Sequence, residues 1–271
     1  IKPAFDDSKW QSVTVPHDWA IYGPFSSLND KQEVAISQDG QKEAMEHAGR
    51  TGGLPFVGVG WYRTEFDVPQ FQAGKRATIL FDGAMSHANV YINGQKVGYW
   101  PYGYNSFHFD ITKYLKPGEK NTLAVRLENL PESSRWYPGA GLYRNVHLII
   151  TEDAYIPVWG TYITTPSVNE KFAKVNVRTK VVLPEGADPA KYSVETSVWN
   201  PNKQKLTAVR TSLAQMKYNN NQAEQEFVIQ APSLWSPEMP ALYSAETRLY
   251  EGDKLKDIYT TPFGIRSIEI I

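Results

Sequence analysis

Apolar and polar side chains alternate with a period of two residues along most of the chain, whereas helical periodicity is scarce. Between Asn121 and Leu130, for example, Leu123, Val125 and Leu127 share one face of an expected strand and the residues between them share the other. Similar short runs in the first half of the chain cover residues 61–69, 76–84, 106–112 and 142–150. Many short strands separated by turn residues predict an antiparallel sandwich or jelly roll here.

The clearest single element in this half is a hairpin over His87–Trp100. Two runs rich in strand-forming residues flank the dipeptide Asn93-Gly94, which favours a two-residue type I′ turn. The hydrophobic pattern therefore predicts two antiparallel strands joined at this point.

After Ile150 the pattern changes, and residues 151–160 suit a linker because they include a proline and begin with few strong strand formers. The alternation then resumes and continues to the end of the chain. About seven short strands predict an immunoglobulin-like sandwich, although the cysteine pair of antibody domains is absent. We expect an all-β protein, with a jelly-roll sandwich over residues 1–152 and an immunoglobulin-like β-sandwich over residues 153–271.

One segment, Gly23–Gly60, breaks the alternation and is rich in Gly, Ser, Gln and Asp. Such a long irregular stretch is either a surface excursion or functional. Within it, Gly40–Gly49 is compatible with one or two helical turns. The glycines of Gly52–Gly60 do not favour a phosphate loop, because a strand rather than a helix follows them; packing against aromatic side chains is the better interpretation.

Composition narrows the function classes. The 271 residues carry a formal net charge of −1, which argues against nucleic acid as a partner. No apolar stretch is long enough to span a bilayer. The absence of cysteine excludes disulfides and thiolate chemistry, and it fits both a cytoplasmic and a periplasmic protein. No signal peptide is visible in a chain whose start looks cut, and we lean towards a periplasmic or extracellular bacterial location.

Catalytic motifs are missing from the sequence. There is no G-x-S-x-G motif, and the five histidines show no metal-ligand spacing, so we expect neither a metal nor a cofactor. The three histidines in or beside expected strands are interpreted as packed or surface residues: His87, His108 and His147. Glycoside hydrolysis needs two carboxylates across one sugar, but the 29 Asp and Glu residues suggest no particular pair.

The stretch "SRWYPGAGLYRNV" (Ser134–Val146) raises a separate question. It combines aromatic residues, glycines, a proline and two arginines in thirteen positions. Glycine and proline mark turns, so the stretch is either a binding loop or a stiff corner between two strands.

Seven segments, in order, resemble the N-terminal part of glycoside hydrolase family 2, most closely its bacterial β-galactosidase branch. They are "VTVPHDWAI", "GVGWYRTEFDVP", "FDGAMSHANVYINGQKVGYWPYGYNSFHFDIT", "NTLAVRLEN", "SRWYPGAGLYRNV", "PSLWSPEMPALY" and "FGIRSIEI". The resemblance implies a galactose-binding-like jelly roll, an immunoglobulin-like sandwich and then a TIM barrel with two catalytic glutamates of a retaining mechanism. The "FGIRSIEI" strand would lead into that barrel, which this sequence lacks, so we expect an inactive fragment.

The same resemblance suggests substrate-binding residues. The loop before "GAGLYRNV" would reach the mouth of the barrel, with Ser134 at the position of an Asp that contacts sugar and sodium in some relatives, so a sodium site is in doubt. Arg135 offers hydrogen-bond donors suited to sugar hydroxyls; alternatively, it stacks on Trp136 or Tyr137 and stiffens the corner. Asn29 is the candidate contact in the other irregular segment. His17–Trp19 is interpreted as a structural corner, and Trp136, Pro138 and Gly141 are interpreted as structural residues.

Three hypotheses follow. The chain is the non-catalytic front of a family 2 glycosidase, with a β-galactoside or other glycan as substrate and the enzyme's own TIM barrel as partner. Alternatively, it is a stand-alone carbohydrate-binding module or a purely structural two-sandwich module. A β-glucuronidase or β-mannosidase of the same family and a homo-oligomer remain open.

Overall fold

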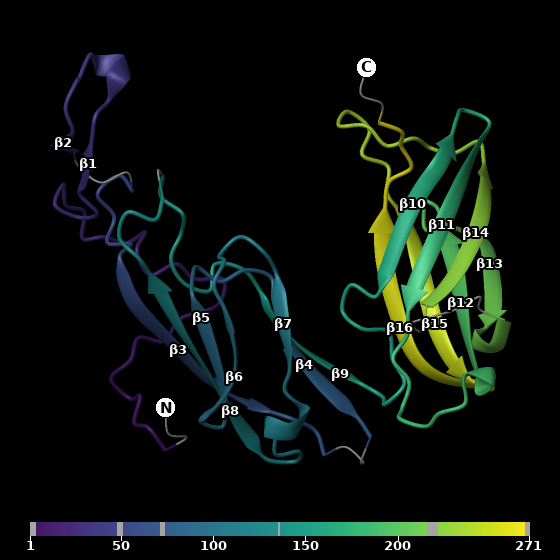
Figure 1. Ribbon diagram of the computed structural model, residues 1–271. Coiled ribbons are helices and arrows are strands. Elements are labelled where there is room, and N and C mark those ends of the chain that lie inside the picture. The colour runs from purple at the N-terminus through teal and green to yellow at the C-terminus, as the bar shows by residue number, and fades with distance from the viewer. Residues whose placement is uncertain (1–3, 48–50, 71–73, 135, 216–221, 269–271) are drawn as a thin grey trace. The chain divides into compact units, whose positions relative to one another are not determined.

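The computed structural model describes residues 4–47, 51–70, 74–134, 136–215 and 222–268. The chain divides into two compact units, Ile1–Ile150 and Thr151–Ile271, each built from antiparallel sheets (Figure 1). The prediction of an all-β fold, with a jelly roll followed by an immunoglobulin-like sandwich, is confirmed.

The first unit packs a four-stranded sheet, in the order β3-β8-β5-β6, with a three-stranded sheet, in the order β7-β4-β9. Their bounds are β3 (Gly58–Asp67), β4 (Arg76–Phe81), β5 (Ala88–Ile92), β6 (Gln95–Trp100), β7 (Phe107–Asp110), β8 (Lys120–Asn129) and β9 (Val146–Thr151). A short 3-10 turn, Thr112–Tyr114, follows β7. This places strands where the alternation predicts them.

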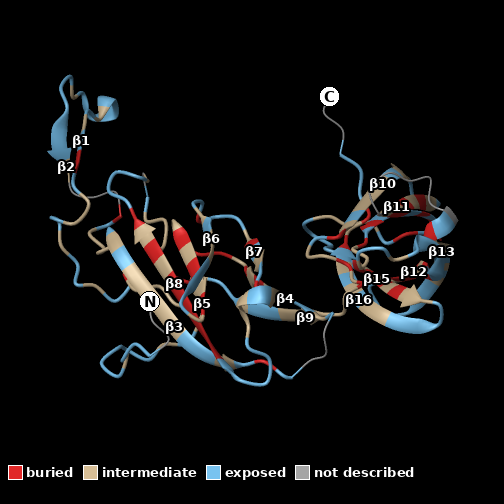
Figure 2. Cartoon of the chain, turned by 60° about the horizontal axis from the view of Figure 1, so that its bottom comes forward, coloured by how far each residue is buried: buried red, intermediate tan, exposed pale blue. Residues whose placement is uncertain are grey.

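The core of this unit lies between the two sheets. Leu123, Val125 and Leu127 of β8 point into it, and Figure 2 shows buried positions along β5 and β8 in the middle of the four-stranded sheet. Aromatic rings fill the opposite side, where Phe107 stacks on Phe81 with ring centroids 4.8 Å apart. Burying one such large side chain contributes roughly 1.5–3 kcal/mol.

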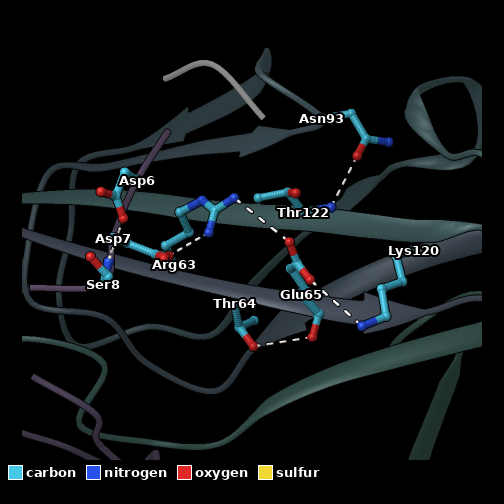
Figure 3. A network of polar contacts seen from close by, with 9 residues as sticks. All are labelled: Asp6, Asp7, Ser8, Arg63, Thr64, Glu65, Asn93, Lys120 and Thr122. Carbon is cyan, nitrogen blue, oxygen red and sulfur yellow. Dashed lines mark hydrogen bonds and ion pairs between the residues drawn. The ribbon is translucent and has the colours of Figure 1, made fainter. Parts of the chain in front are cut away.

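The N-terminal segment is attached to the outer face of β3 by charged groups (Figure 3). The Arg63 side chain, only 6% exposed, pairs with the Asp7 carboxylate. Glu65 lies 3.9 Å from the Arg63 guanidinium and 3.8 Å from the Lys120 ammonium. Because Arg63 is covered, its pair with Asp7 is better shielded from solvent than a typical surface ion pair.

The irregular segment before β3 contains a small hairpin of β1 (Gln32–Val34) and β2 (Met45–His47), with a 3-10 turn at Ser37–Asp39 between the strands. Figure 1 shows this hairpin standing apart from the sheets of the first unit. The expectation of helical turns over Gly40–Gly49 is wrong. Met45–His47 is extended instead, because it pairs with Gln32–Val34 in register.

In the described residues of the second unit, seven strands form two sheets, in the orders β10-β11-β14 and β13-β12-β15-β16. Their bounds are β10 (Thr161–Val168), β11 (Phe172–Lys180), β12 (Tyr192–Trp199), β13 (Lys205–Ser212), β14 (Gln222–Gln230), β15 (Tyr243–Glu251) and β16 (Lys254–Phe263), with 3-10 turns at Pro189–Lys191 and Leu213–Gln215. Valines, alanines and aromatic rings from both sheets form its core.

Two details of the second unit differ from the sequence-based expectations. β10 contains Pro166 and a register shift between Thr164 and Ser167, so its side chains do not alternate regularly and the hydrophobic pattern did not predict this strand. At the other end, β16 ends at Phe263, and residues 264–268 are not a strand, although Ile265 is fully buried. Over the described ranges, no helix is long and apolar enough to cross a membrane.

Candidate sugar-contact loops

The second half of the loop between β8 and β9 is fixed against the start of the chain. The His17 N–H donates to the Leu142 carbonyl at 2.8 Å, and the Trp19 N–H donates to the Ala140 carbonyl at 3.2 Å. These two backbone bonds hold the segment around His17 alongside residues 140–142. This half of "SRWYPGAGLYRNV" is therefore a stiff corner.

Asp18 is the centre of that corner. Its carboxylate accepts three hydrogen bonds. The donors are the Tyr137 hydroxyl at 2.5 Å, the Ala140 N–H at 3.0 Å and the Ala20 N–H at 2.9 Å. Burial and the neighbouring Asp18 charge raise the pKa of the Tyr137 hydroxyl, which therefore remains a donor at ordinary pH. Asp18 thus ties two distant segments together and serves as a structural residue.

Gly141 allows the closest approach in this corner. It has φ of 107°, and a Cβ there would lie 2.2 Å from the Tyr62 hydroxyl and 2.7 Å from the His17 carbonyl. Tyr62 itself is hydrogen-bonded to His17 Nδ1 at 2.8 Å, and burial raises its pKa to about 12. His17 and Asp18 have internal partners, which agrees with their interpretation as a structural corner.

The first half of the loop is exposed. Trp136, expected to be structural, has 57% of its surface in solvent, although its indole N–H donates to the Tyr104 hydroxyl at 2.9 Å. The Ser134 hydroxyl accepts a hydrogen bond from the Trp136 backbone N–H at 3.3 Å, and a hydroxyl that accepts one bond can also donate its proton. Arg135 lies outside the described residues.

The two irregular segments meet, although about a hundred residues separate them in the sequence. Gln32, only 3% exposed, donates its side-chain amide to the Ser134 carbonyl at 3.3 Å. The Glu132 N–H lies 3.5 Å from the Asp30 carboxylate. The structure therefore brings the β1–β2 hairpin to the exposed half of the β8–β9 loop.

Asn29 lies in the same segment, three residues before Gln32. Its side-chain N–H₂ group donates to the Gly53 carbonyl at 2.9 Å and to the Pro24 carbonyl at 3.4 Å. Those bonds orient its donors towards the loop itself, so a ligand would meet the amide oxygen. The role of Asn29 and Ser134 in binding sugar stays a prediction.

Within the part of the chain that the structure describes, no group of three or more His, Asp or Glu side chains is placed to hold a metal ion. Two expected surface histidines have partners: His87 Nδ1 lies 2.6 Å from the Tyr99 hydroxyl, and His147 Nε2 lies 2.9 Å from the Asp82 carboxylate. Burial lowers the pKa of His108 in β7.

Sequence reasoning did not identify two residues of this region. Gln32 is a buried polar residue in a stretch without hydrophobic periodicity, and only the fold shows that it joins the two loops. Tyr104 positions the Trp136 indole, and the only signal was its place in the aromatic run "WPYGYN".

Two protein-family models match the chain, and both describe the same family. The model "Glycosyl hydrolases family 2, sugar binding domain" matches residues 49–152, and the model "Glycosyl hydrolases family 2" matches residues 155–266. The chain belongs to glycoside hydrolase family 2. The β8–β9 loop falls within the match to the sugar-binding domain of this family, whereas Asn29 and the β1–β2 hairpin precede it.

Curated relatives and solved structures agree with this assignment. The family 2 chain is 38% identical over 270 residues to "Beta-galactosidase BoGH2A" of Bacteroides ovatus, covering 99% of this chain and 30% of that protein. It is 32% identical over 222 residues to a beta-glucuronidase of Bacteroides fragilis, covering 77% of this chain and 31% of that protein. A solved family 2 member from Bacteroides cellulosilyticus matches with a TM-score of 0.82 at 32% identity, covering 99% of this chain and 33% of that one.

The family 2 chain therefore spans about a third of the length of the proteins it matches. The two matched models leave the β1–β2 hairpin outside their ranges.

Proposed function

We propose that this chain works as the non-catalytic N-terminal part of a retaining family 2 β-galactosidase, in which a TIM barrel supplies the catalytic carboxylates. The two sandwiches would support the barrel, and their loops would complete its sugar pocket. The curated relatives include glycosidases about three times as long as this chain, which supports the proposal.

The meeting of the two irregular segments is the observation that carries the proposal. The Gln32–Ser134 hydrogen bond brings together two loops, each with a candidate sugar contact. The corner around Asp18 holds the second loop at its base. A loop fixed in this way loses little conformational entropy when it binds a ligand.

The residues have distinct roles in this proposal. Ser134 would donate its hydroxyl proton to a sugar oxygen, Asn29 would accept through its amide oxygen, and Arg135 would donate through its guanidinium. A neutral hydroxyl at Ser134 binds a cation more weakly than a carboxylate would, so sodium would contribute little here.

β-Galactoside is favoured as the substrate because the relative with 38% identity over nearly the whole chain is named a β-galactosidase. A β-glucuronide is the second candidate, since another relative of 32% identity is named a beta-glucuronidase. The barrel would make most of the distinction between the two sugars.

The test compares this chain with the longer protein that carries the barrel, using nitrophenyl β-galactoside and nitrophenyl β-glucuronide. We expect turnover of the galactoside by the longer protein and none by the 271-residue chain. Hydrolysis by the short chain, or no glycosidase activity in the longer protein, would contradict the proposal.

Substitutions then test the loop. Arg135→Ala in the longer protein should lower kcat/KM by roughly 5- to 150-fold, which corresponds to about 1–3 kcal/mol of lost transition-state stabilisation, the range for a lost charged donor. Arg144→Ala is the matched control, because Arg144 follows the braced corner and its guanidinium donates to the Asp82 carbonyl. Ser134→Asp should introduce sodium-dependent activity, whereas Ser133→Asp, one residue away, should not.

A further inference from the structure

An exposed aromatic cluster lies beside the proposed sugar-contact loop. Tyr102 and Tyr104 come from the loop between β6 and β7, and Trp136 comes from the loop between β8 and β9. Their exposed fractions are 53%, 43% and 57%. Monomeric proteins rarely leave several large rings together in solvent without a function.

Contacts between the rings make the cluster continuous. The Trp136 indole N–H donates to the Tyr104 hydroxyl at 2.9 Å, and the Tyr102 and Tyr104 rings meet edge to face with centroids 5.5 Å apart. Trp136 is therefore oriented by a ring from a different loop. The cluster ends two residues from Ser134.

Hydrogen bonds from neighbouring residues hold the backbone of the loop that carries the two tyrosines. The Tyr143 hydroxyl donates to the Gly103 carbonyl at 2.6 Å, and the Ser106 hydroxyl donates to the Asp82 carbonyl at 3.0 Å. A Cβ on Gly103 would lie 2.2 Å from the Met85 sulfur, so the backbone packs directly on that side chain. The rings are thus presented on a braced backbone, which reduces the entropy lost on binding.

We propose that Tyr102, Tyr104 and Trp136 form an aromatic platform that binds a sugar ring of an oligosaccharide beyond the residue in the proposed pocket. The inference rests on the proposed glycosidase function and names its substrate class as a glycan of at least two or three sugars. A pyranose ring carries C–H groups on one face and hydroxyls around its rim. The C–H face packs on the electron-rich face of an aromatic ring.

The chemistry of the cluster favours a sugar over a protein partner. Its rings are Tyr and Trp, whose polar tips can meet sugar hydroxyls, and polar side chains such as Asn105 and Ser133 adjoin them in the sequence. A second exposed segment of this unit includes Ile21, Phe25 and Leu28, whose side chains carry no polar group. Those three side chains offer nothing to a sugar hydroxyl, in contrast to the Tyr and Trp rings of the cluster.

Binding of β-1,4-galactotriose and cellotriose to the 271-residue chain, followed by tryptophan fluorescence and calorimetry, tests the platform. We expect a trisaccharide to bind and Trp136→Ala to weaken its binding about tenfold or more, as for a base stacked on an aromatic ring. Trp136→Phe keeps a ring and should retain most of the affinity. Trp159→Ala, which removes a tryptophan that is 56% exposed in the second unit, should leave binding unchanged.

Melting temperatures of all three variants separate lost binding from lost folding. No binding of either trisaccharide, or equal binding by Trp136→Ala and the parent chain, would overturn the platform. An interface with the barrel would be indicated instead if the short chain bound no glycan and Trp136→Ala lowered the melting temperature only of the longer protein. Nitrophenyl β-galactoside hydrolysis by the longer protein tests the proposed function separately, because that substrate has one sugar.

Discussion

At the scale of single residues, glycine is required at position 141 for two independent reasons. Its φ of 107° belongs to a region that other residues rarely adopt, and a side chain would meet the His17 carbonyl at 2.7 Å. The nearby Tyr62 ring could rotate away, but the backbone carbonyl could not move without breaking the bond between His17 and Leu142. The corner therefore depends on the absence of a Cβ.

Gly141→Ala should lower the free energy of unfolding of the first unit by about 3 kcal/mol or more, because backbone strain and overlap add. Gly186→Ala is a matched control: Gly186 also has a positive φ, of 75°, but nothing lies within 4 Å of its Cβ position. Gly186→Ala should lower the free energy of unfolding only by the backbone strain, roughly 1 kcal/mol. Urea unfolding measures both; equal losses would mean that the close approach at Gly141 contributes nothing.

Asp257 in β16 gives the second unit a pH dependence. Burial raises the pKa of its carboxyl group, although the N–H groups of Ile156 and Ile258 donate to it at 2.8 and 2.9 Å and partly oppose the shift. An acid whose pKa is higher in the folded state keeps its proton longer there than in the unfolded state. The stability that Asp257 contributes to the fold is complete below the ordinary pKa of 3.8. It is lost as pH rises through the higher pKa of the folded state.

Asp257→Asn keeps an acceptor oxygen but cannot ionise. The free energy of unfolding of the variant should therefore fall less than that of the parent chain as pH rises from below 3.8 through the raised pKa of the folded state. Asp253→Asn, at an exposed turn position, should leave the parent profile unchanged. Parallel profiles for Asp257→Asn and the parent chain would refute this assignment.

At the scale of elements, the β5–β6 hairpin shows how a local signal and a tertiary network reinforce each other. Asn93 and Gly94 have φ of 51° and 80°, as the predicted type I′ turn requires. The Asn93 side chain also donates to the Asn121 side chain at 2.7 Å and the Tyr114 carbonyl at 2.9 Å, and it accepts the Thr122 N–H at 2.9 Å. The turn thus joins β8 as well as closing the hairpin, and Figure 3 shows its bond to Thr122.

Asn93→Ala should lower the free energy of unfolding by about 3 kcal/mol, because it leaves several partly buried groups without partners. Lys203→Ala tests the backbone effect alone, since Lys203 has φ of 61° in an exposed turn of the second unit. Chemical denaturation that gave equal losses for the two variants would show that the Asn93 side-chain network is unimportant.

The elements that the sequence predicts are those whose pattern is local. The alternation of β8 appears directly in the burial of Leu123, Val125 and Leu127, because one face of a strand meets the core. β1 and β2 are three residues each and follow no alternation, so only their mutual pairing defines them. The same limit applies to the site: the contact of Gln32 with Ser134 depends on tertiary structure, whereas the structural role of Gly141 was visible as a glycine in a corner.

At the scale of the whole molecule, each unit has a core of its own. The clusters around Phe81 and Phe56 contain only residues of the first unit, and those around Phe227 and Tyr192 contain only residues of the second. Independent cores are the physical requirement for independent folding. The family models match the two parts separately, at residues 49–152 and 155–266.

We therefore expect residues 1–152 and 153–271 to fold separately, as the sequence-based boundary proposes. A cut after residue 152 keeps β9 whole, since that strand ends at Thr151. It also keeps Asp153 in the second piece, where its carboxylate lies 3.1 Å from the Lys256 ammonium, whose side chain is only 8% exposed. Each piece should show dispersed amide resonances and a cooperative urea transition.

Moving the cut to follow residue 157 tests whether that boundary is sharp. The shorter second piece would lose Asp153, the Ile156 N–H that Asp257 accepts, and the backbone bonds between Tyr155 and Val182 at 3.0 and 2.8 Å. Lys256 and Asp257 would then have fewer partners, and the core would lack Ile156. We therefore expect the free energy of unfolding to fall by about 3 kcal/mol or more. Residues 158–271 should therefore unfold at a clearly lower urea concentration than residues 153–271. Equal midpoints for the two pieces would mean that residues 153–157 only connect the sandwiches and add nothing to the stability of the second.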